Sequence, residues 1–383
     1  MKNSCILLIL LCFCLQFGKT QVPSRTICKL PNVLVESSGL YVPSPDSIWS
    51  HGDSGNPAEL YLIDTMGKLK RTVKVQGVFN TDWEELAADS KGNLYVGDFG
   101  NNANNRRDLA IYKIIDFRNL RTDTVTPQII RFSYEDQTAF PPPLSNYVYD
   151  AEAMLVFDDS IFIATKDFHA KPYIGITRIY RIPNRVGTHI AAFVAQVVTD
   201  GSDKQYGGIT GMAMSADRKK VVLISHSKLY LAENFAGRAF WTVPWRSTTI
   251  SPFTSREAVA FVDSCQLYLS DDLGSGTAGN LFGFDLCKWQ SSLTSTTKEV
   301  FQPTMTCFPN PSVIGQDVTI LFKNTLFVDR KLRMFDVLGR KIATFEIGKG
   351  VEKWVISREL LENGRIWLIQ MEGNNQTLKL LRF

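Results

Sequence analysis

Short apolar runs alternate with polar turns through most of this chain, from about residue 25 to residue 286. The runs are rich in β-branched and aromatic residues, and Gly, Asn and Asp separate them, which is typical of strands and tight turns. Five runs end in an acidic or His-containing turn, at residues 48–53, 94–98, 161–167, 221–226 and 267–271. Another run follows each of them, at residues 60–64, 109–114, 178–182, 228–231 and 281–284. No stretch keeps a helical period, so the pattern predicts an all-β chain.

An internal match shows that these runs belong to a repeated unit. Residues 25–30 and 38–40 (Arg-Thr-Ile-Cys-Lys-Leu and Ser-Gly-Leu) recur with one offset as residues 71–76 and 84–86. Units of strands that recur in this way, about every 45 to 70 residues, are typical of β-propeller blades. We expect five blades, and six as the alternative, because the segment between Ile114 and Asp150 could hold further strands. The strand at 25–30 should complete the last blade and close the ring.

Acidic residues recur at the same two places in the units. Glu84, Glu152 and Glu257 open predicted first strands, and a first strand of a blade begins at the face where the second strand ends. In two units the Glu and the Asp that ends the second strand are 14 residues apart, and in the third they are 15 apart. We therefore expect a ligand-binding face formed by His51, Asp53, Asp98, Asp167, His226 and Asp271, with the three glutamates nearest the axis.

Such a ring of carboxylates repels itself unless a cation, a basic group or raised pKa values relieve it. Oxygen ligands suit Ca²⁺ or Mg²⁺, so the three glutamates are candidate metal ligands. A metal there could activate water against a phosphoester or a lactone. In general layout the chain is similar to the gluconolactonase/regucalcin and β-propeller phytase families, although no motif matches residue by residue. The alternative is structural, because Asp in such turns often bonds its own backbone.

The cysteines indicate one disulfide. Cys265 opens one predicted strand and Cys287 follows the next, and the loop between these strands is centred on Gly276. In an antiparallel hairpin the two residues would face each other closely enough to bridge.

The last 76 residues carry a different order of elements. They contain a Pro-Asn-Pro opening, a strand at residues 318–322, an Asp-x-x-Gly-Arg turn, strands at 353–356 and 366–369, and a basic end at 377–382. This order resembles the C-terminal sorting domain of proteins exported by the type IX secretion system of Bacteroidota. The residues that carry the resemblance are Pro309, Asn310, Pro311, Asp336, Gly339, Arg340 and Gly364. The resemblance implies a small antiparallel β-sandwich, the secretion machinery as a partner, and a cell-surface or extracellular location.

The start of the chain agrees with export across both membranes. A basic residue precedes the apolar run at residues 5–15, which has the length of a signal-peptide core and is too short to span a bilayer. Acylation of Cys12 or Cys14 is the lipoprotein alternative. We expect a signal peptide at 1–20, a propeller at 21–300, a linker at 301–307 and the sorting domain at 308–383.

Charge narrows the choice of partners. The formal net charge is +4, without a basic block, so nucleic acid is not indicated, and no later segment predicts a transmembrane helix. Two functions stay open on the sequence. The first is a binding module for glycan or protein, in which the Asn-rich loop at residues 101–107 would be a contact. The second is a metal-dependent hydrolase that uses the axial carboxylates.

Overall fold

The computed structural model describes residues 21–173, 175–199, 207–274, 276–292, 305–310, 312–322, 329–336, 340–361, 366–371 and 377–382. The expected signal peptide lies outside these residues. Strands dominate the described part, and its α-helix, α2, spans Leu286–Ser292. Short 3₁₀ turns are η1 (Asn32–Leu34), η2 (Phe117–Asn119), η3 (Leu144–Asn146), η4 (Phe240–Thr242) and η6 (Arg358–Leu361).

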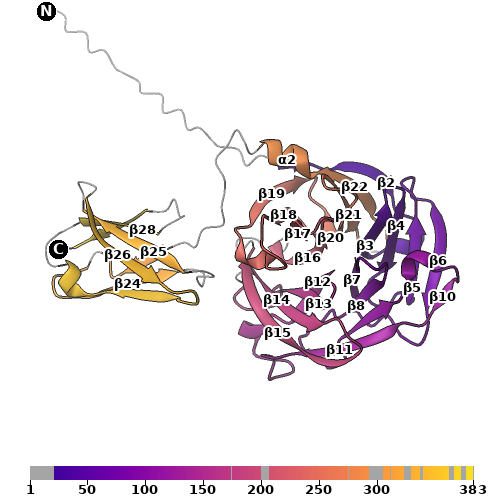
Figure 1. The fold of residues 1–383 in the computed structure, drawn as a ribbon, viewed down its shortest axis with the longest axis horizontal. Helices are drawn as coiled ribbons and strands as arrows, with labels where there is room; N and C mark the ends of the chain where they lie inside the picture. Colours follow the sequence, from indigo (N-terminus) through magenta and orange to yellow (C-terminus); the bar gives the residue numbers. More distant parts are fainter. Residues whose placement is uncertain are drawn as a thin grey trace, which may run out of the picture.

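Hydrogen bonds join the strands of the larger part into two sheets of five strands, one of eight and one of four (Figure 1). Without the edge strands β1 and β10, and with the eight-stranded sheet divided at its parallel pairing of β11 with β15, these strands make five units of four, which we call sheets A to E. Sheet A contains β3 (Ser37–Ser44), β4 (Ser47–Gly52), β5 (Glu59–Ile63) and β6 (Leu69–Val75). Sheet B contains β7 (Trp83–Ala88), β8 (Leu94–Asp98), β9 (Ala110–Ile114) and β11 (Gln128–Tyr134). Sheet C contains β12 (Asp150–Val156), β13 (Ser160–Lys166), β14 (Ile176–Pro183) and β15 (Gly187–Val198). Sheet D contains β16 (Ile209–Met214), β17 (Lys220–Ser225), β18 (Lys228–Glu233) and β19 (Arg246–Ser251). Sheet E contains β20 (Ser255–Phe261), β21 (Gln266–Asp272), β22 (Asn280–Asp285) and β2 (Arg25–Lys29).

The strands expected from the apolar runs are confirmed, and each begins and ends within two residues of its predicted range. The closing role of the N-terminal strand is confirmed as well, because β2 pairs antiparallel with β22 and completes sheet E. The segment between Ile114 and Asp150, all of it described, adds β11 to sheet B and β10 (Thr124–Val125) to the edge of sheet A. That segment therefore forms no additional sheet.

First strands of the five sheets contact one another in turn and close a ring, β3 to β7, β12, β16, β20 and back to β3. Two further pairings tie the outside of the ring. Strand β11 pairs in parallel with β15 and so joins sheets B and C, and β1 (Gln21–Pro23) pairs in parallel with β19. These propeller-like contacts follow from the alternation of side chains along each strand.

Apolar side chains from opposite faces of one strand enter different clusters. In β13, Ile161 and Ile163 pack toward sheet B, whereas Phe162 and Ala164 pack toward sheet D. Five such clusters lie between neighbouring sheets around the ring. Because each sheet is buried on both faces, its strands read as nearly continuous apolar runs.

Cys265 and Cys287 form a disulfide, as expected, with their Cα atoms 5.0 Å apart. The bridge joins the residue before β21 to the first turn of α2, so Cys287 lies in a helix rather than at the end of a strand. No helix among the described residues is both long and apolar enough to cross a bilayer.

The C-terminal residues form two antiparallel sheets around a core of their own. One contains β23 (Met305–Phe308), β24 (Val318–Phe322) and β27 (Lys353–Ile356). The other contains β26 (Lys341–Ile347), β25 (Arg330–Phe335), β28 (Ile366–Met371) and β29 (Thr377–Leu381). All the buried residues of this core lie between Met305 and Leu380, and β23 begins inside the segment expected as a linker.

Candidate functional site

Each of the five first strands shifts its register near its start, which marks a β-bulge. The residues left unpaired there are Ser38 with Gly39 in sheet A, then Glu84, Glu152, Thr210 and Glu257. A bulge re-aims the side chain of the extra residue. Four of these bulge residues, the three glutamates and Ser38, line one cavity at this end of the strands.

This cavity, which we call the axial pocket, has a volume of about 100 Å³. Its walls include six carboxylic acids, Glu36, Asp53, Glu84, Glu152, Glu257 and Asp272, together with Ser37, Ser38, Asn102 and Lys166. Sheets A, B, C and E all contribute to it. The structure therefore brings the three expected glutamates together, from three different sheets.

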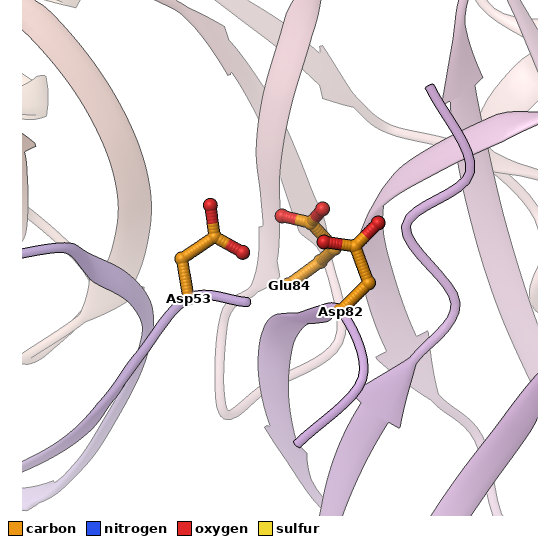
Figure 2. A group of neighbouring side chains, drawn as sticks. All are labelled: Asp53, Asp82 and Glu84. Carbon is orange, nitrogen blue, oxygen red and sulfur yellow. The ribbon is translucent and has the colours of Figure 1, made fainter. Parts of the chain in front are cut away.

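Two carboxylates of the axial pocket and a third beside it converge closely enough to share a cation. Asp53, Asp82 and Glu84 each offer an oxygen atom within 4.8 Å of the others, and we call them the cation triad. Figure 2 shows these carboxylates turned toward one another, Asp53 from the turn after β4 and the other two from the start of β7. The loop beside them needs glycine at position 100, because a Cβ there would lie 2.2 Å from Glu84 Oε1 and 2.5 Å from Asp82 Oδ2.

Burial and mutual repulsion perturb these acids. Burial, with the charges of Asp53 and Asp150, raises the pKa of Asp82 to about 6. Burial and the nearby Glu152 raise the pKa of Glu84 well above its usual range, and burial also raises the pKa of Asp53. Raised pKa values are what closely spaced carboxylates show when no cation neutralises them.

On the other side, the ammonium group of Lys166 relieves part of the charge. Its Nζ lies 2.5 Å from Glu152 Oε1 and 3.8 Å from Asp150 Oδ2. Burial works against the charged form, but the carboxylates of Glu152 and Asp150 raise the pKa of Lys166 well above its usual value. Lys166 therefore stays charged. Of the three forms of relief expected from the sequence, the structure shows two, a basic group and raised pKa values.

His226 lies at the margin of this side of the axial pocket, on the turn after β17. Its Nδ1 is 3.6 Å from Glu257 Oε1, and both side chains are about a fifth exposed. Burial and the charge of Lys166 lower the pKa of His226 to about 4. The imidazole is therefore neutral at pH 7.

Glu85 follows Glu84 in β7 and lies among the first strands, outside the lining of the axial pocket. Its side chain is fully buried, its Oε1 accepts from the Leu86 N–H at 2.9 Å, and its Oε2 accepts from the Met212 N–H at 3.0 Å. The N–H groups of Leu40 and Met154 also point at this carboxylate. These four donors come from the first strands of four sheets, at the same position after each bulge. The other sheets carry Gly39, Ala153, Gly211 and Ala258 where sheet B has Glu85, which leaves room for its side chain.

Of the other residues expected on the ligand-binding face, one lines the axial pocket and four do not. Asp53 lines the axial pocket, whereas His51, Asp98, Asp167 and Asp271 are buried and are not among its lining residues. Asp98 accepts from Tyr112 Oη at 2.7 Å and from Arg106 at 2.9 Å. Asp167 and Asp271 accept backbone N–H groups, from Gly175 and Asn280. His51 packs on Trp83, and burial lowers its pKa to about 4.

Strand pairing explains this division. In each sheet one residue lies directly beyond the partner of the residue before the bulge; in order these residues are Asp53, Phe99, Lys166, His226 and Asp272. Asp53, Lys166 and Asp272 line the axial pocket, whereas Phe99 packs in the core between sheets B and C. Asp98 and Asp271 lie one position earlier and Asp167 one later. A shift of one residue turns a side chain to the other face of a strand, and the 14- and 15-residue spacings mixed these positions.

Sequence reasoning missed Asp82, Glu85 and Lys166. Asp82 lies two residues before Glu84, as Asp150 lies before Glu152, so the repeated Asp-x-Glu was a usable signal. Lys166 directly precedes Asp167 in the run that ends the second strand of sheet C. Glu85 gave no signal, because its role depends on donors from four sheets.

In the C-terminal part, three of the expected motif residues, Asn310, Asp336 and Arg340, stabilise turns and edges. The Asn310 side chain donates to the Lys379 carbonyl at 2.8 Å and accepts from the Leu381 N–H at 2.9 Å, which holds the terminal strand. Asp336 accepts from the Arg340 N–H and pairs with its guanidinium at 2.7 Å. Pro309 is described and half-buried, and Pro311, Gly339 and Gly364 lie outside the described residues.

No protein-family model matches this chain, and no curated protein sequence matches it. Solved structures with a similar fold include PorZ, described as an essential surface component of the type-IX secretion system of Porphyromonas gingivalis. PorZ is 12% identical with a TM-score of 0.33, and the match covers 91% of this chain and 45% of PorZ. This chain thus spans less than half the length of PorZ.

Two enzymes show the same kind of likeness. A PQQ-bound aldose sugar dehydrogenase from Streptomyces coelicolor is 13% identical with a TM-score of 0.40, over 68% of this chain and 96% of that one. An α-L-arabinofuranosidase from Podospora anserina is 9% identical with a TM-score of 0.39, over 70% and 97%. Likenesses this distant do not bear on activity.

Proposed function

We propose that this chain is an exported five-bladed β-propeller that binds its ligand through a divalent cation held by Asp53, Asp82 and Glu84. The observation that carries the proposal is the convergence of these three carboxylates within 4.8 Å of one another, two of which, Asp53 and Glu84, line the axial pocket. The five mutually contacting first strands support five blades rather than six.

The residues present fit a hard cation. All three triad ligands are carboxylate oxygens, which suit Ca²⁺ or Mg²⁺ and are poor ligands for softer metals. Lys166 is the single basic residue among the lining residues, against six acids, so the acids outnumber the positive charge that the side chains themselves supply. The backbone of Gly100 lies close to the carboxylates of Asp82 and Glu84 and restricts their positions on that side.

The size of the axial pocket limits what can reach such a cation. About 100 Å³ holds a few water molecules or one functional group, so the bulk of a ligand must lie outside. Phe79 and Phe253 precede first strands at this end and are 85% and 55% exposed. Exposed aromatic rings at the same end of the first strands as a cation suit a glycan, which stacks its apolar face and coordinates through its hydroxyl groups.

Calorimetric titration of the purified chain with Ca²⁺, Mg²⁺ and Mn²⁺ tests the cation site. We expect Asp82→Asn and Glu84→Gln to weaken binding at least tenfold. Asp123→Asn, which changes a carboxylate that is 76% exposed elsewhere, is the matched control and should bind like the wild type. Absence of binding for all three metals at millimolar concentration would refute the cation site.

A glycan array probed with and without EDTA then tests the ligand class. Glycan binding that disappears with EDTA and returns with Ca²⁺ is the expected result. If the cation binds but no glycan does, a protein ligand takes its place in the proposal.

A metal-dependent hydrolase is the second candidate, and His226 favours it. This imidazole faces Glu257 at the margin of the axial pocket and is neutral at pH 7, so it can accept a proton. Hydrolysis of p-nitrophenyl esters or of bis-p-nitrophenyl phosphate, lost with EDTA and with His226→Gln, would identify the enzyme. Cation binding without any such turnover would leave the binding module.

We also propose that residues 308–383 form the sorting domain for type IX secretion. The separate core and the turn-stabilising roles of Asn310 and Asp336 support this reading. Fusion of residues 305–383 to a periplasmic reporter in a type IX-competent bacterium should move the reporter to the cell surface or the medium. Retention of the fusion in the periplasm would contradict the assignment.

A further inference from the structure

Two of the three residues of the cation triad have counterparts elsewhere in the ring. Asp82-Trp83-Glu84 in sheet B and Asp150-Ala151-Glu152 in sheet C occupy the same strand position, with the glutamate at the bulge and the aspartate two residues earlier. Each pair lies at the start of a first strand, and these two strands contact each other. We call Asp150 and Glu152 the C half-site.

The two Asp-x-Glu pairs differ in the charged side chain that faces them. Asp82 and Glu84 face Asp53, which comes from the end of the second strand of sheet A. The C half-site instead faces Lys166, from the equivalent position of its own sheet. The Lys166 Nζ lies 2.5 Å from Glu152 Oε1 and 3.8 Å from Asp150 Oδ2.

The C half-site is not fully satisfied by this lysine. The Asp150 side chain is 3% exposed, and its Oδ1 accepts from the Asn101 N–H at 2.7 Å. Its Oδ2 is buried without a hydrogen-bond partner among the described residues and points toward the ammonium group. A buried carboxylate oxygen left without a donor is costly, and it marks a place where a second positive charge would be stabilised.

We propose that Lys166 is a tethered cation, which takes at Asp150 and Glu152 the place that the divalent cation takes at Asp82 and Glu84. Lys166 thereby restricts the axial pocket to one divalent cation, on the side of Asp53. This inference rests on the proposed cation triad and adds the residue that sets the number and position of the ions.

The chemistry of the side chain suits this role. Lysine carries a compact point charge on a flexible apolar stem, whereas methionine has a similar stem and no charge. Lys166→Met should therefore leave the packing beside Gly208 and Phe168 intact while it uncovers both carboxylates of the C half-site. Lys166→Arg keeps the positive charge and is the matched control.

The test measures bound Ca²⁺ per chain, by mass spectrometry of the metal after equilibrium dialysis and by calorimetry, for wild type, Lys166→Met and Lys166→Arg. We expect about one ion for wild type and Lys166→Arg and about two for Lys166→Met, since each carboxylate cluster can hold one hard cation. A Lys166→Met variant that binds one ion with wild-type affinity would overturn the role of Lys166 and leave the cation triad standing.

The same measurement shows whether the cation triad fails instead of the role of Lys166. Binding by Lys166→Met alone, with none in the wild type, would support the tethered cation and refute the cation triad. Absence of binding in every variant would refute both.

If Lys166→Met does not fold, a further variant tests the proposal. A triple variant, Asp150→Asn with Glu152→Gln and Lys166→Met, removes the lysine together with the charges it neutralises and should fold without metal. If the triple variant folds, Ca²⁺ should restore the circular dichroism of Lys166→Met. Failure of millimolar Ca²⁺ to restore it would overturn the proposal.

Discussion

Glu84 and Glu85 are neighbours in β7, but replacing each by glutamine should change the stability of the protein very differently. Glu84 lies in the axial pocket among other carboxylates, whereas the carboxylate of Glu85 receives backbone N–H donors from four sheets. We predict that Glu85→Gln destabilises the protein strongly and that Glu84→Gln, without cation, does not. The two variants differ by one position and by nothing in their chemistry.

The size of the effect follows from the hydrogen bonds of Glu85. Its two oxygens accept at 2.9 and 3.0 Å from Leu86 and Met212, and Leu40 and Met154 supply further N–H groups. A hydrogen bond to a charged group contributes about 1.5–3 kcal/mol, and a buried donor left without its acceptor costs about 1–3 kcal/mol. Glutamine keeps one acceptor oxygen but turns an NH₂ group toward the remaining donors. We expect a loss of about 3 kcal/mol.

This prediction assumes that Glu85 is ionised, and the measurement tests that assumption. Burial raises the pKa of Glu85, and the backbone N–H groups act against that rise. A protonated carboxyl would point its own O–H at an N–H donor, so four converging donors favour the carboxylate. Glutamine would replace a protonated acid almost without cost.

Urea unfolding at pH 7.5 in EDTA, followed by tryptophan fluorescence, measures both variants. Each unfolding curve gives the free energy of unfolding and the m-value, and equal m-values show that the variants unfold in the same way. The reasoning is refuted if Glu85→Gln lies within about 0.5 kcal/mol of the wild type, a range typical of surface substitutions. It is equally refuted if Glu84→Gln is the more destabilised of the two.

Three further outcomes can be checked. Because the pKa of Asp82 is raised to about 6, protons compete with the cation, and Ca²⁺ affinity should fall by up to about tenfold per pH unit below about 6; calorimetry that shows a pH-independent affinity would contradict this. Without cation, the folded state holds the Asp82 proton more tightly than the unfolded state does, so stability should fall as the pH rises from about 4 to 6, and Asp82→Asn should flatten that part of the urea-unfolding profile. Replacement of Cys265 and Cys287 by serine opens a 22-residue loop and should lower the free energy of unfolding by about 3 kcal/mol, with an unchanged midpoint contradicting the disulfide's role.

The strands themselves could be predicted because each is encoded locally. Residues 94–98 and 318–322 were predicted at the bounds that β8 and β24 have, since an apolar run between turn residues needs no distant partner to be recognised. The disulfide could be predicted for a related reason, because a hairpin places its two ends together. Parallel pairings such as β11 with β15 could not, since they join segments whose contact depends on the curvature of the ring.

For the candidate site, the sequence determined which residue types recur and how far apart they stand. It was enough to single out Glu84, Glu152 and Glu257, whose carboxylates line one cavity. Only the tertiary structure decided that Asp53, rather than Asp98 or Asp271, lines that cavity, because Asp53 lies one residue further along its second strand than Asp98 and Asp271 do along theirs, and one residue reverses the face. Only the tertiary structure placed Lys166 against Glu152 and four N–H groups around Glu85. The N–H groups around Glu85 come from sheets that are distant in sequence, and the contact of Lys166 with Glu152 depends on the register of two neighbouring strands; spacing along the chain measures neither.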